Sequence, residues 1–213
     1  MKSTFYGESE RRQFLKNALS AGALICAGCH QLFAGEPSLS AVGSHTNTDL
    51  ENDTGPDTGM TPEEVVRFTL GYCVPTYQFL LKEMGKEKFL KLLREASIDN
   101  KKQLIDSLAK DMPDRNLNQL AELVLGYLGT PPFNKIFTTE VVEKSDTVLE
   151  IKYTRCLFAE VYREMNASDI GFIVECGGSK DTARAYNPEI NVSLSSSMMK
   201  GDNHCTKRFE VES

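Results

Sequence analysis

Residues 136–154 read IFTTEVVEKSDTVLEIKYT, and this stretch decides the fold class. Two runs rich in Val, Ile, Thr and Tyr, Ile136 to Glu143 and Thr147 to Thr154, flank the polar link Lys144-Ser145-Asp146. β-Branched and aromatic residues favour strands, and a short polar link between two such runs is typical of a hairpin. The sequence therefore predicts that an antiparallel sheet begins here.

Before this hairpin, apolar residues recur at three- and four-residue spacing, which is the pattern of amphipathic helices. The first helix is predicted to start at Thr61-Pro62-Glu63-Glu64, because Thr can cap it, Pro suits its first position and Glu can return a bond to the cap. Pro75 is predicted to kink this helix and Gly85 to end it. Three more helices are predicted around residues 89–96, 104–108 and 117–128.

After the hairpin, the sequence predicts a short helix over residues 157–165 and an ambiguous stretch from Ser168 to Tyr186. Two further strands follow, separated by a turn at residues 200–203. Because strands have a period of two, one face is predicted to carry Ile190, Val192 and Leu194 together with Cys205, Phe209 and Val211. Helices first and strands later predict an α+β domain over residues 61–213, its N-terminal helical part packed on a C-terminal antiparallel sheet of about four strands.

The N-terminus carries an export pattern. The run Arg11-Arg12-Gln13-Phe14-Leu15-Lys16 precedes the apolar stretch 18–25, which predicts a twin-arginine signal peptide over residues 1–35, although Glu10 stands where Ser or Thr is usual. The alternative is a short helix of the mature fold, but this stretch lacks helical periodicity. The expected partner is the twin-arginine export machinery, and the expected location is periplasmic or membrane-tethered outside the cytoplasm.

The end of the signal has two interpretations. Cys26-Ala27-Gly28-Cys29 resembles a lipobox, which makes Cys29 a candidate for a lipid anchor, and cleavage after Ala34 is the alternative. Cleavage before Cys29 removes four basic and two acidic residues, which leaves 20 Lys and Arg against 28 Asp and Glu, a net charge of −8. That balance argues against a nucleic-acid partner. Residues 36–60 are polar and are predicted to be a disordered tether.

Four cysteines remain in the predicted domain. Cys73 lies on the apolar face of a helix and is predicted to be a small buried hydrophobe. The other three stand at special places: Cys156 where a strand gives way to a helix, Cys176 before Gly177-Gly178, and Cys205 after the turn, with Asp181 and His204 nearby in sequence. They could form a disulfide framework, a zinc site or a nucleophilic thiol, and the spacing leaves all three open. Gly177-Gly178 lacks the glycine spacing of a phosphate-binding loop, so no cofactor is expected.

The region from Arg155 onward resembles a known family, the L-2-amino-thiazoline-4-carboxylic acid hydrolases. The resemblance rests on an ordered set of motifs: Arg155-Cys156 before a short helix, Cys176 with Asp181 five residues on, Tyr186-Asn187-Pro188 before a strand, and Gly201-Asp202-Asn203-His204-Cys205 before the last strand. It implies hydrolysis of a cyclic amidine, in which water adds to the ring carbon between nitrogen and sulfur, the carbon–sulfur bond breaks and N-carbamoyl-cysteine results.

The resemblance also implies roles for individual residues. Cys176 would be the nucleophile, Asp181 the acid/base, and His204 with Cys205 the pair that handles protons or positions the substrate. The substrate would be bound by Arg155, Cys156 and Asp202. Arg155 would pair with the carboxylate of the substrate. No metal ligands are assigned. Simpler interpretations are a turn former for Asp202, an exposed loop residue for His204 and a surface charge for Arg155. The alternative function is a non-catalytic exported module that binds or senses a small molecule.

Overall fold

The computed structural model describes residues 60–211, so the predicted signal peptide, Cys29 and nearly all of the predicted tether lie outside the described residues. The helical elements are α2 (Pro62–Met84), α3 (Lys86–Leu108), α4 (Leu117–Gly129), α5 (Phe133–Ile136), α6 (Leu157–Glu164), α7 (Ser168–Gly171), the π-helix η2 (Phe172–Cys176), α8 (Ser179–Tyr186) and the 3-10 turn η3 (Met198–Lys200). The strands are β1 (Phe137–Lys144), β2 (Val148–Cys156), β3 (Ile190–Ser196) and β4 (Cys205–Val211).

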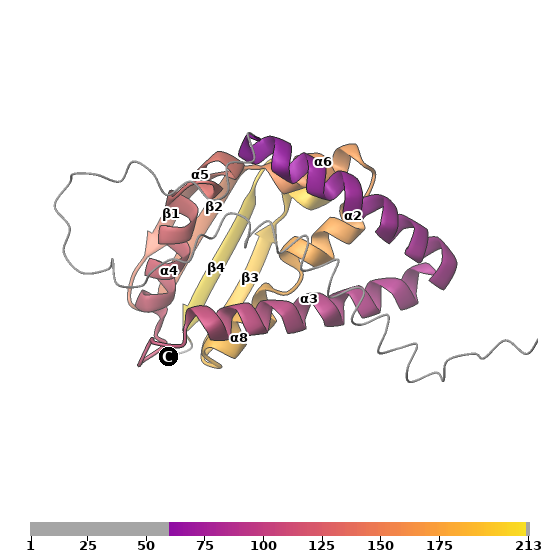
Figure 1. Ribbon diagram of the computed structural model, residues 1–213. Coiled ribbons are helices and arrows are strands. Elements are labelled where there is room, and N and C mark those ends of the chain that lie inside the picture. Colours follow the sequence, from indigo (N-terminus) through magenta and orange to yellow (C-terminus); the bar gives the residue numbers. More distant parts are fainter. Residues whose placement is uncertain (1–59, 212–213) are drawn as a thin grey trace, which may run out of the picture.

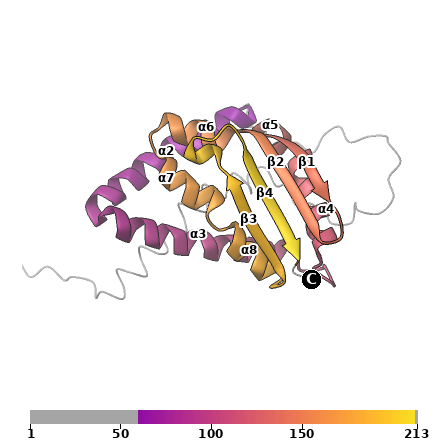
Figure 2. The same cartoon turned by 180° about the vertical axis from the view of Figure 1, so that it is seen from behind.

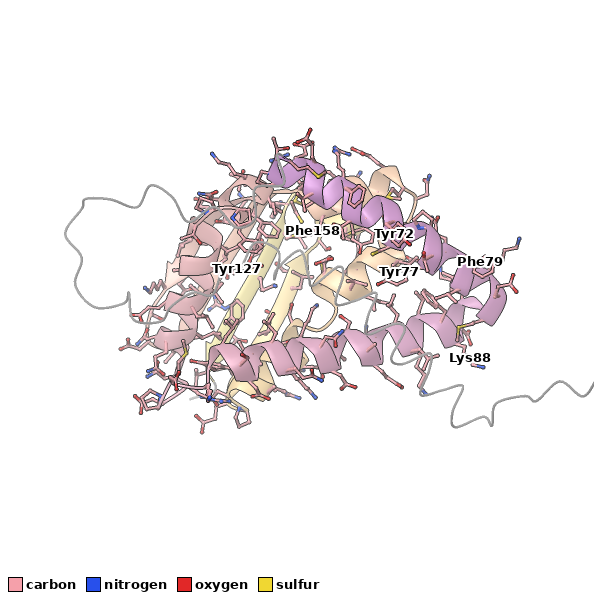
Figure 3. The ribbon with its side chains drawn as sticks, viewed as in Figure 1. Tyr72, Tyr77, Phe79, Lys88, Tyr127 and Phe158 are labelled. Carbon is pink, nitrogen blue, oxygen red and sulfur yellow. The ribbon has the colours of Figure 1, made fainter. Side chains whose placement is uncertain are left out.

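The first helix begins and ends where the sequence predicts. Thr61 caps α2, because the Glu64 backbone N–H donates to Thr61 Oγ1 at 3.2 Å and the Thr61 N–H donates to Glu64 Oε2 at 2.7 Å. The helix runs through Pro75 and ends at Gly85, whose φ of 83° suits glycine. Its inner face carries the buried Tyr77, which lies between α2 and α3 with its ring centroid 6.1 Å from that of Phe89, whereas Tyr72 and Phe79 are exposed (Figure 3).

The second and third predicted helices are one helix. α3 is continuous from Lys86 to Leu108, so the prediction of a break between residues 96 and 104 was wrong. This segment holds no Gly or Pro, and Glu95, Lys101 and Gln103 within it favour helix, so the gap in the apolar pattern did not mark a break. Its first half packs on α2, and its second half packs on α8 and η2 (Figure 1).

The sheet has four antiparallel strands in the order β1-β2-β4-β3, which confirms the α+β prediction. The predicted hairpin is β1 and β2, with the Ser145 N–H donating to the carbonyl of Val148 at 2.8 Å. Val192 pairs with Phe209 and Ile190 with Val211, so the apolar residues of β3 and β4 share one face, as predicted.

Helices cover one face of the sheet, and no helix of residues 60–211 covers the other (Figures 1 and 2). On the covered face, Leu149 and Ile151 are fully buried in a cluster that includes Leu120 of α4. On the uncovered face, Arg208 binds carboxylates on three strands, with distances of 2.6 Å to Glu143, 2.8 Å to Glu150 and 3.2 Å to Glu210. The polar face therefore meets solvent, and the apolar face meets the helices.

None of the helices described between residues 60 and 211 is long and apolar enough to cross a membrane. The stretch that the sequence left ambiguous, Ser168 to Tyr186, forms α7, η2 and α8 in succession. It runs along α3, and it carries Cys176 at the end of η2.

Candidate active site

The structure brings Cys156, Cys176 and Cys205 together from three separate segments. Cys156 ends β2, Cys176 ends η2 and Cys205 begins β4. Each of the first two thiols lies within electrostatic reach of the other and of Cys205. Within the described part of the chain, none of the three forms a disulfide, and neither does the buried Cys73. Four ionisable side chains surround them, and we call the whole group the thiol cluster: Cys156, Cys176, Cys205, Lys101, Tyr153, Glu175 and Lys207.

The sheet supplies part of the thiol cluster through its register. Cys205 and Lys207 are two residues apart on β4, on the same face as the buried Phe209. Tyr153 pairs with Cys205, and Ile151 pairs with Lys207, so these side chains face the helices. The Lys207 ammonium lies 5.9 Å from the centre of the Tyr153 ring, within the range of a cation–π contact.

The π-helix η2 supplies Cys176 and Glu175. Its wide turn is closed by the Gly177 N–H, which donates to the carbonyl of Phe172 at 2.6 Å. A π-turn disturbs the regular carbonyl pairing of a helix, and such turns are frequent at functional sites. Here side chains of α3 and α8 bind the carbonyls.

Side-chain hydrogen bonds from α3 and α8 hold η2 in place. Ser97 Oγ donates to the carbonyl of Val174 at 3.2 Å, and Lys101 Nζ donates to that of Glu175 at 3.2 Å. Ser179 Oγ donates to the carbonyl of Cys176 at 3.0 Å. The backbone around the Cys176 thiol is therefore fixed from both sides.

The two glycines after Cys176 adopt helical angles rather than a loop. Gly177 and Gly178 have φ of −68° and −99°, so their role is not a left-handed turn. A Cβ at Gly178 would lie 3.1 Å from Cδ of Lys101. The missing side chain at Gly178 therefore leaves room for Lys101 to reach η2.

Burial dominates the electrostatics of the thiol cluster. It raises the pKa of Cys156 to about 12, although the nearby Ala159 backbone N–H opposes this, and it raises the pKa of Cys176 to about 11. Burial also raises the pKa of Tyr153 above its ordinary value. At neutral pH, Cys156 and Cys176 are therefore protonated.

The pKa values of the two lysines and the glutamate in the thiol cluster shift toward neutral pH. Burial lowers the pKa of Lys101 to about 8, lowers that of Lys207, and raises that of Glu175 to about 7. As whole residues, Glu175 and Lys207 keep some accessible surface, but protein encloses their charged ends, and that enclosure shifts their pKa values. Groups that titrate near neutrality can exchange protons with a substrate.

Two residues predicted to bind substrate have other contacts. Asp202 is exposed, and its Oδ2 accepts from the Ser197 backbone N–H at 2.7 Å, which closes the turn before β4. Arg155 donates to the carbonyl of Lys135 at 2.9 Å and forms ion pairs with Glu160 at 3.3 Å and Glu63 at 3.6 Å. Both residues therefore have structural partners already.

Asp181 and His204 lie apart from the contacts that define the thiol cluster. Asp181 is in the first turn of α8, His204 immediately precedes β4, and both are partly exposed. Within residues 60–211, no interaction is found that joins either side chain to the three thiols. Their roles in proton transfer stay predictions.

Sequence reasoning missed Lys101, Tyr153, Glu175 and Lys207. One of them had a signal: Lys207 alternates with Cys205 and Phe209, so the period of two places a lysine on the buried face. A lysine at an inward position is unusual and is a hint of function. No pattern in the sequence brings Lys101 toward the thiols, because its position depends on the packing of α3 against η2.

A separate pocket of about 630 Å³ lies next to η2. Phe172 and Ile173 line it together with the cations Arg94, Arg163 and Lys200. No member of the thiol cluster lines this pocket. We therefore place the candidate active site at the thiol cluster, which holds the candidate nucleophile and the ionisable side chains around it. Within the described part of the chain, no group of three or more His, Cys, Asp or Glu side chains is arranged to hold a metal ion.

Comparisons with known proteins identify the family of the chain. The model of the L-2-amino-thiazoline-4-carboxylic acid hydrolase family matches residues 66–209, which include every member of the thiol cluster. No match is found among curated proteins. Among solved structures, the phenol-responsive sensory domain of the transcription activator PoxR with phenol aligns at a TM-score of 0.42 and 11% identity, over 64% of this chain and 71% of that chain. That likeness is too distant to carry an argument. The match over most of the folded domain shows that the chain belongs to the L-2-amino-thiazoline-4-carboxylic acid hydrolase family.

Proposed function

We propose that this protein is a hydrolase that opens the ring of a cyclic amidine of the 2-amino-thiazoline-4-carboxylate type at the thiol cluster. One observation carries the proposal: in a chain of this family, Cys176 is held beside two further thiols, two buried lysines and a buried carboxyl group. Ring opening needs a nucleophile, a proton donor for the departing sulfur and a partner for the substrate carboxylate. The thiol cluster offers a side chain for each need.

The roles follow from the contacts of the members. Cys176 is the proposed nucleophile, because fixed carbonyls on η2 position its backbone. Cys205 accepts a hydrogen bond from the Met198 backbone N–H at 3.1 Å, so its sulfur is oriented and it assists in positioning. Lys101 is a better partner for the substrate carboxylate than Arg155, because Arg155 already pairs with two carboxylates.

A turnover assay with purified protein tests the proposal. The substrate is 2-amino-thiazoline-4-carboxylate, and the product N-carbamoyl-cysteine is quantified by mass spectrometry. We expect the Cys176→Ser variant to lose turnover by about 100-fold or more, because a neutral hydroxyl is a far poorer nucleophile than a thiolate. The matched control is Cys73→Ala, since Cys73 is buried in the helical core on α2 and is not a member of the thiol cluster.

A second candidate function is a non-catalytic exported module that binds or senses a small molecule on the same scaffold. The pKa values of Cys156 and Cys176 favour it, because burial keeps both as unreactive thiols in the absence of a base. The absence of product with wild-type protein, together with measurable binding of the thiazoline carboxylate, would support this second function.

We also propose that residues 1–35 direct export through the twin-arginine pathway, with Cys29 as a candidate lipid anchor. The support is the paired Arg11-Arg12 before a short apolar stretch. The enzyme would then work outside the cytoplasm.

A further inference from the structure

We propose that the pocket of about 630 Å³ beside η2 binds a small organic carboxylate, with its charged group beside the cations of the pocket and its hydrocarbon body against the apolar lining. The volume is in the range of small-molecule sites. This second site is separate from the thiol cluster and does not depend on the proposed ring opening.

Cations gather around this pocket without carboxylate partners. Arg94 of α3, Arg163 of α6 and Lys200 of η3 line it, and within residues 60–211 none of the three forms an ion pair. The carboxylate in the lining, Asp169, pairs with Lys86 instead. The chain has 30 Asp and Glu against 24 Lys and Arg, so three unpaired cations around one hollow are a local imbalance. An anionic ligand would offset it through charge-assisted hydrogen bonds.

The apolar lining of the pocket is packed in place. Met199 is only 2% exposed, and Leu90 and Phe172 line the pocket with it. Gly171 allows this packing, because a Cβ there would lie 2.5 Å from Cγ of Tyr162 and 2.8 Å from Sδ of Met199. The pocket therefore offers a hydrocarbon body an apolar surface that is already formed.

Lys200 is anchored beside the aromatic wall of the pocket. Its ammonium lies 4.0 Å from the centre of the Phe172 ring, within the range of a cation–π contact. Its backbone N–H donates to the carbonyl of Ser197 at 2.9 Å. The following Gly201 N–H donates to the carbonyl of Met198 at 3.1 Å. A fixed positive charge next to an apolar ring suits a ligand that carries a carboxylate on a hydrocarbon body.

The charges of the lining favour a ligand with one negative charge. The guanidinium groups of Arg94 and Arg163 each present a planar fork of donors that matches a carboxylate. Asp169 also lines the pocket, and its negative charge opposes a doubly charged group such as a phosphate monoester. A monocarboxylate is therefore favoured over a phosphate ester.

The test measures binding of phenylacetate to the purified full chain by calorimetric titration. Phenylacetate carries a carboxylate on a flat apolar body, and phenylacetamide is the neutral control of nearly the same shape. We expect phenylacetamide to bind about tenfold more weakly or not at all, because it lacks the charge. Added NaCl should weaken the binding of phenylacetate, since the cations are exposed. Equal affinity for the two compounds, or no binding of phenylacetate, would overturn the proposal.

Two variants test whether the cations of the pocket hold the anion. We expect Arg94→Gln and Arg163→Gln each to raise the Kd for phenylacetate by about fivefold or more. The matched control is Lys91→Gln, because Lys91 is exposed on the same helix as Arg94 but does not line the pocket. All three side chains are exposed, so the variants should melt like wild type. An unchanged Kd in both arginine variants would overturn the proposal.

A methyl signal distinguishes this pocket from the thiol cluster. In protein labelled with [methyl-13C]methionine, the ring of bound phenylacetate should shift the NMR signal of Met199. The signal of Met112, which packs against the cluster that includes Leu120, should stay in place. An unshifted Met199 signal, together with binding that is lost in Lys101→Met and kept in Arg94→Gln, would put the anion at the thiol cluster and overturn the assignment to the pocket.

Discussion

Lys101 of α3 donates a hydrogen bond from Nζ to the backbone carbonyl of Glu175 at 3.2 Å. This bond joins α3 to the π-helix η2, which carries Cys176. The neighbouring bond from Ser97 to Val174 reinforces it at 3.2 Å. Lys101 therefore has two effects: it fixes the backbone next to Cys176, and it places a basic side chain near the thiol.

The first prediction concerns the substrate carboxylate. We expect Lys101→Met to raise KM by about tenfold or more, because it removes a cation of the thiol cluster that forms no carboxylate ion pair within residues 60–211. Arg155→Gln should change KM by less than about threefold, because its guanidinium is held by Glu63 and Glu160. Steady-state kinetics on both variants check this. A larger KM effect at Arg155 would return the carboxylate site to that residue.

The second prediction concerns pH and stability through Glu175. Burial raises its pKa from 4.5 to about 7, so between these values the folded protein binds more protons than the unfolded chain. The free energy of unfolding should therefore fall as pH rises from about 4.5 to about 7. Denaturant unfolding across this range checks the slope.

Two variants isolate the contribution of Glu175 to that slope. Glu175→Gln should lose the fall in stability with pH, whereas Glu140→Gln, at an exposed position on β1, should keep it. An unchanged slope in Glu175→Gln would mean that the carboxyl group is not enclosed as the structure has it.

The third prediction compares two glycines. Gly126 lies inside α4 with open space where a Cβ would be, so Gly126→Ala should stabilise the protein by about 1 kcal/mol. Gly178→Ala should bring no such gain and should lower turnover, because the added Cβ pushes on Lys101 at 3.1 Å. Thermal unfolding and turnover of the two variants check this. A neutral effect of Gly178→Ala on turnover would show that Lys101 adjusts freely.

Local patterns predicted most of the fold. The capping box at Thr61 and Glu64, the stop at Gly85 and the hairpin on either side of Ser145 are signals that a few neighbouring residues contain, and the structure confirms them. The period of two also placed Val192 and Phe209 on one face. The predicted break in α3 was wrong. A polar stretch without Gly or Pro can continue a helix when the segments on both sides of it are helical.

The candidate site was predictable only in part. Cys156, Cys176 and Cys205 stand at element boundaries, which a sequence shows. Lys101 joins them through the packing of α3 on η2, a long-range contact that no local pattern encodes. The π-helix itself was hidden in the ambiguous stretch, because its apolar residues follow neither the helix nor the strand period.

The fourth prediction concerns export. Replacing Arg11 and Arg12 by Lys should keep a fusion of residues 1–35 with a reporter inside the cytoplasm, because the pathway reads the arginine pair. Cell fractionation checks this, and Lys16→Arg is the control that leaves the pair intact. Full export of the double variant would contradict the twin-arginine interpretation.

The central claim is that Cys176 forms a covalent bond with the ring carbon during turnover, and one measurement tests it most directly. Purified protein is mixed with 2-amino-thiazoline-4-carboxylate, quenched with acid within the first turnover and digested for peptide mass spectrometry. We expect an adduct of the intact substrate on the peptide that carries Cys176, and its absence in Cys176→Ser. Product formation by Cys176→Ser at the wild-type rate, or an adduct on Cys156 or Cys205 instead, would contradict the account.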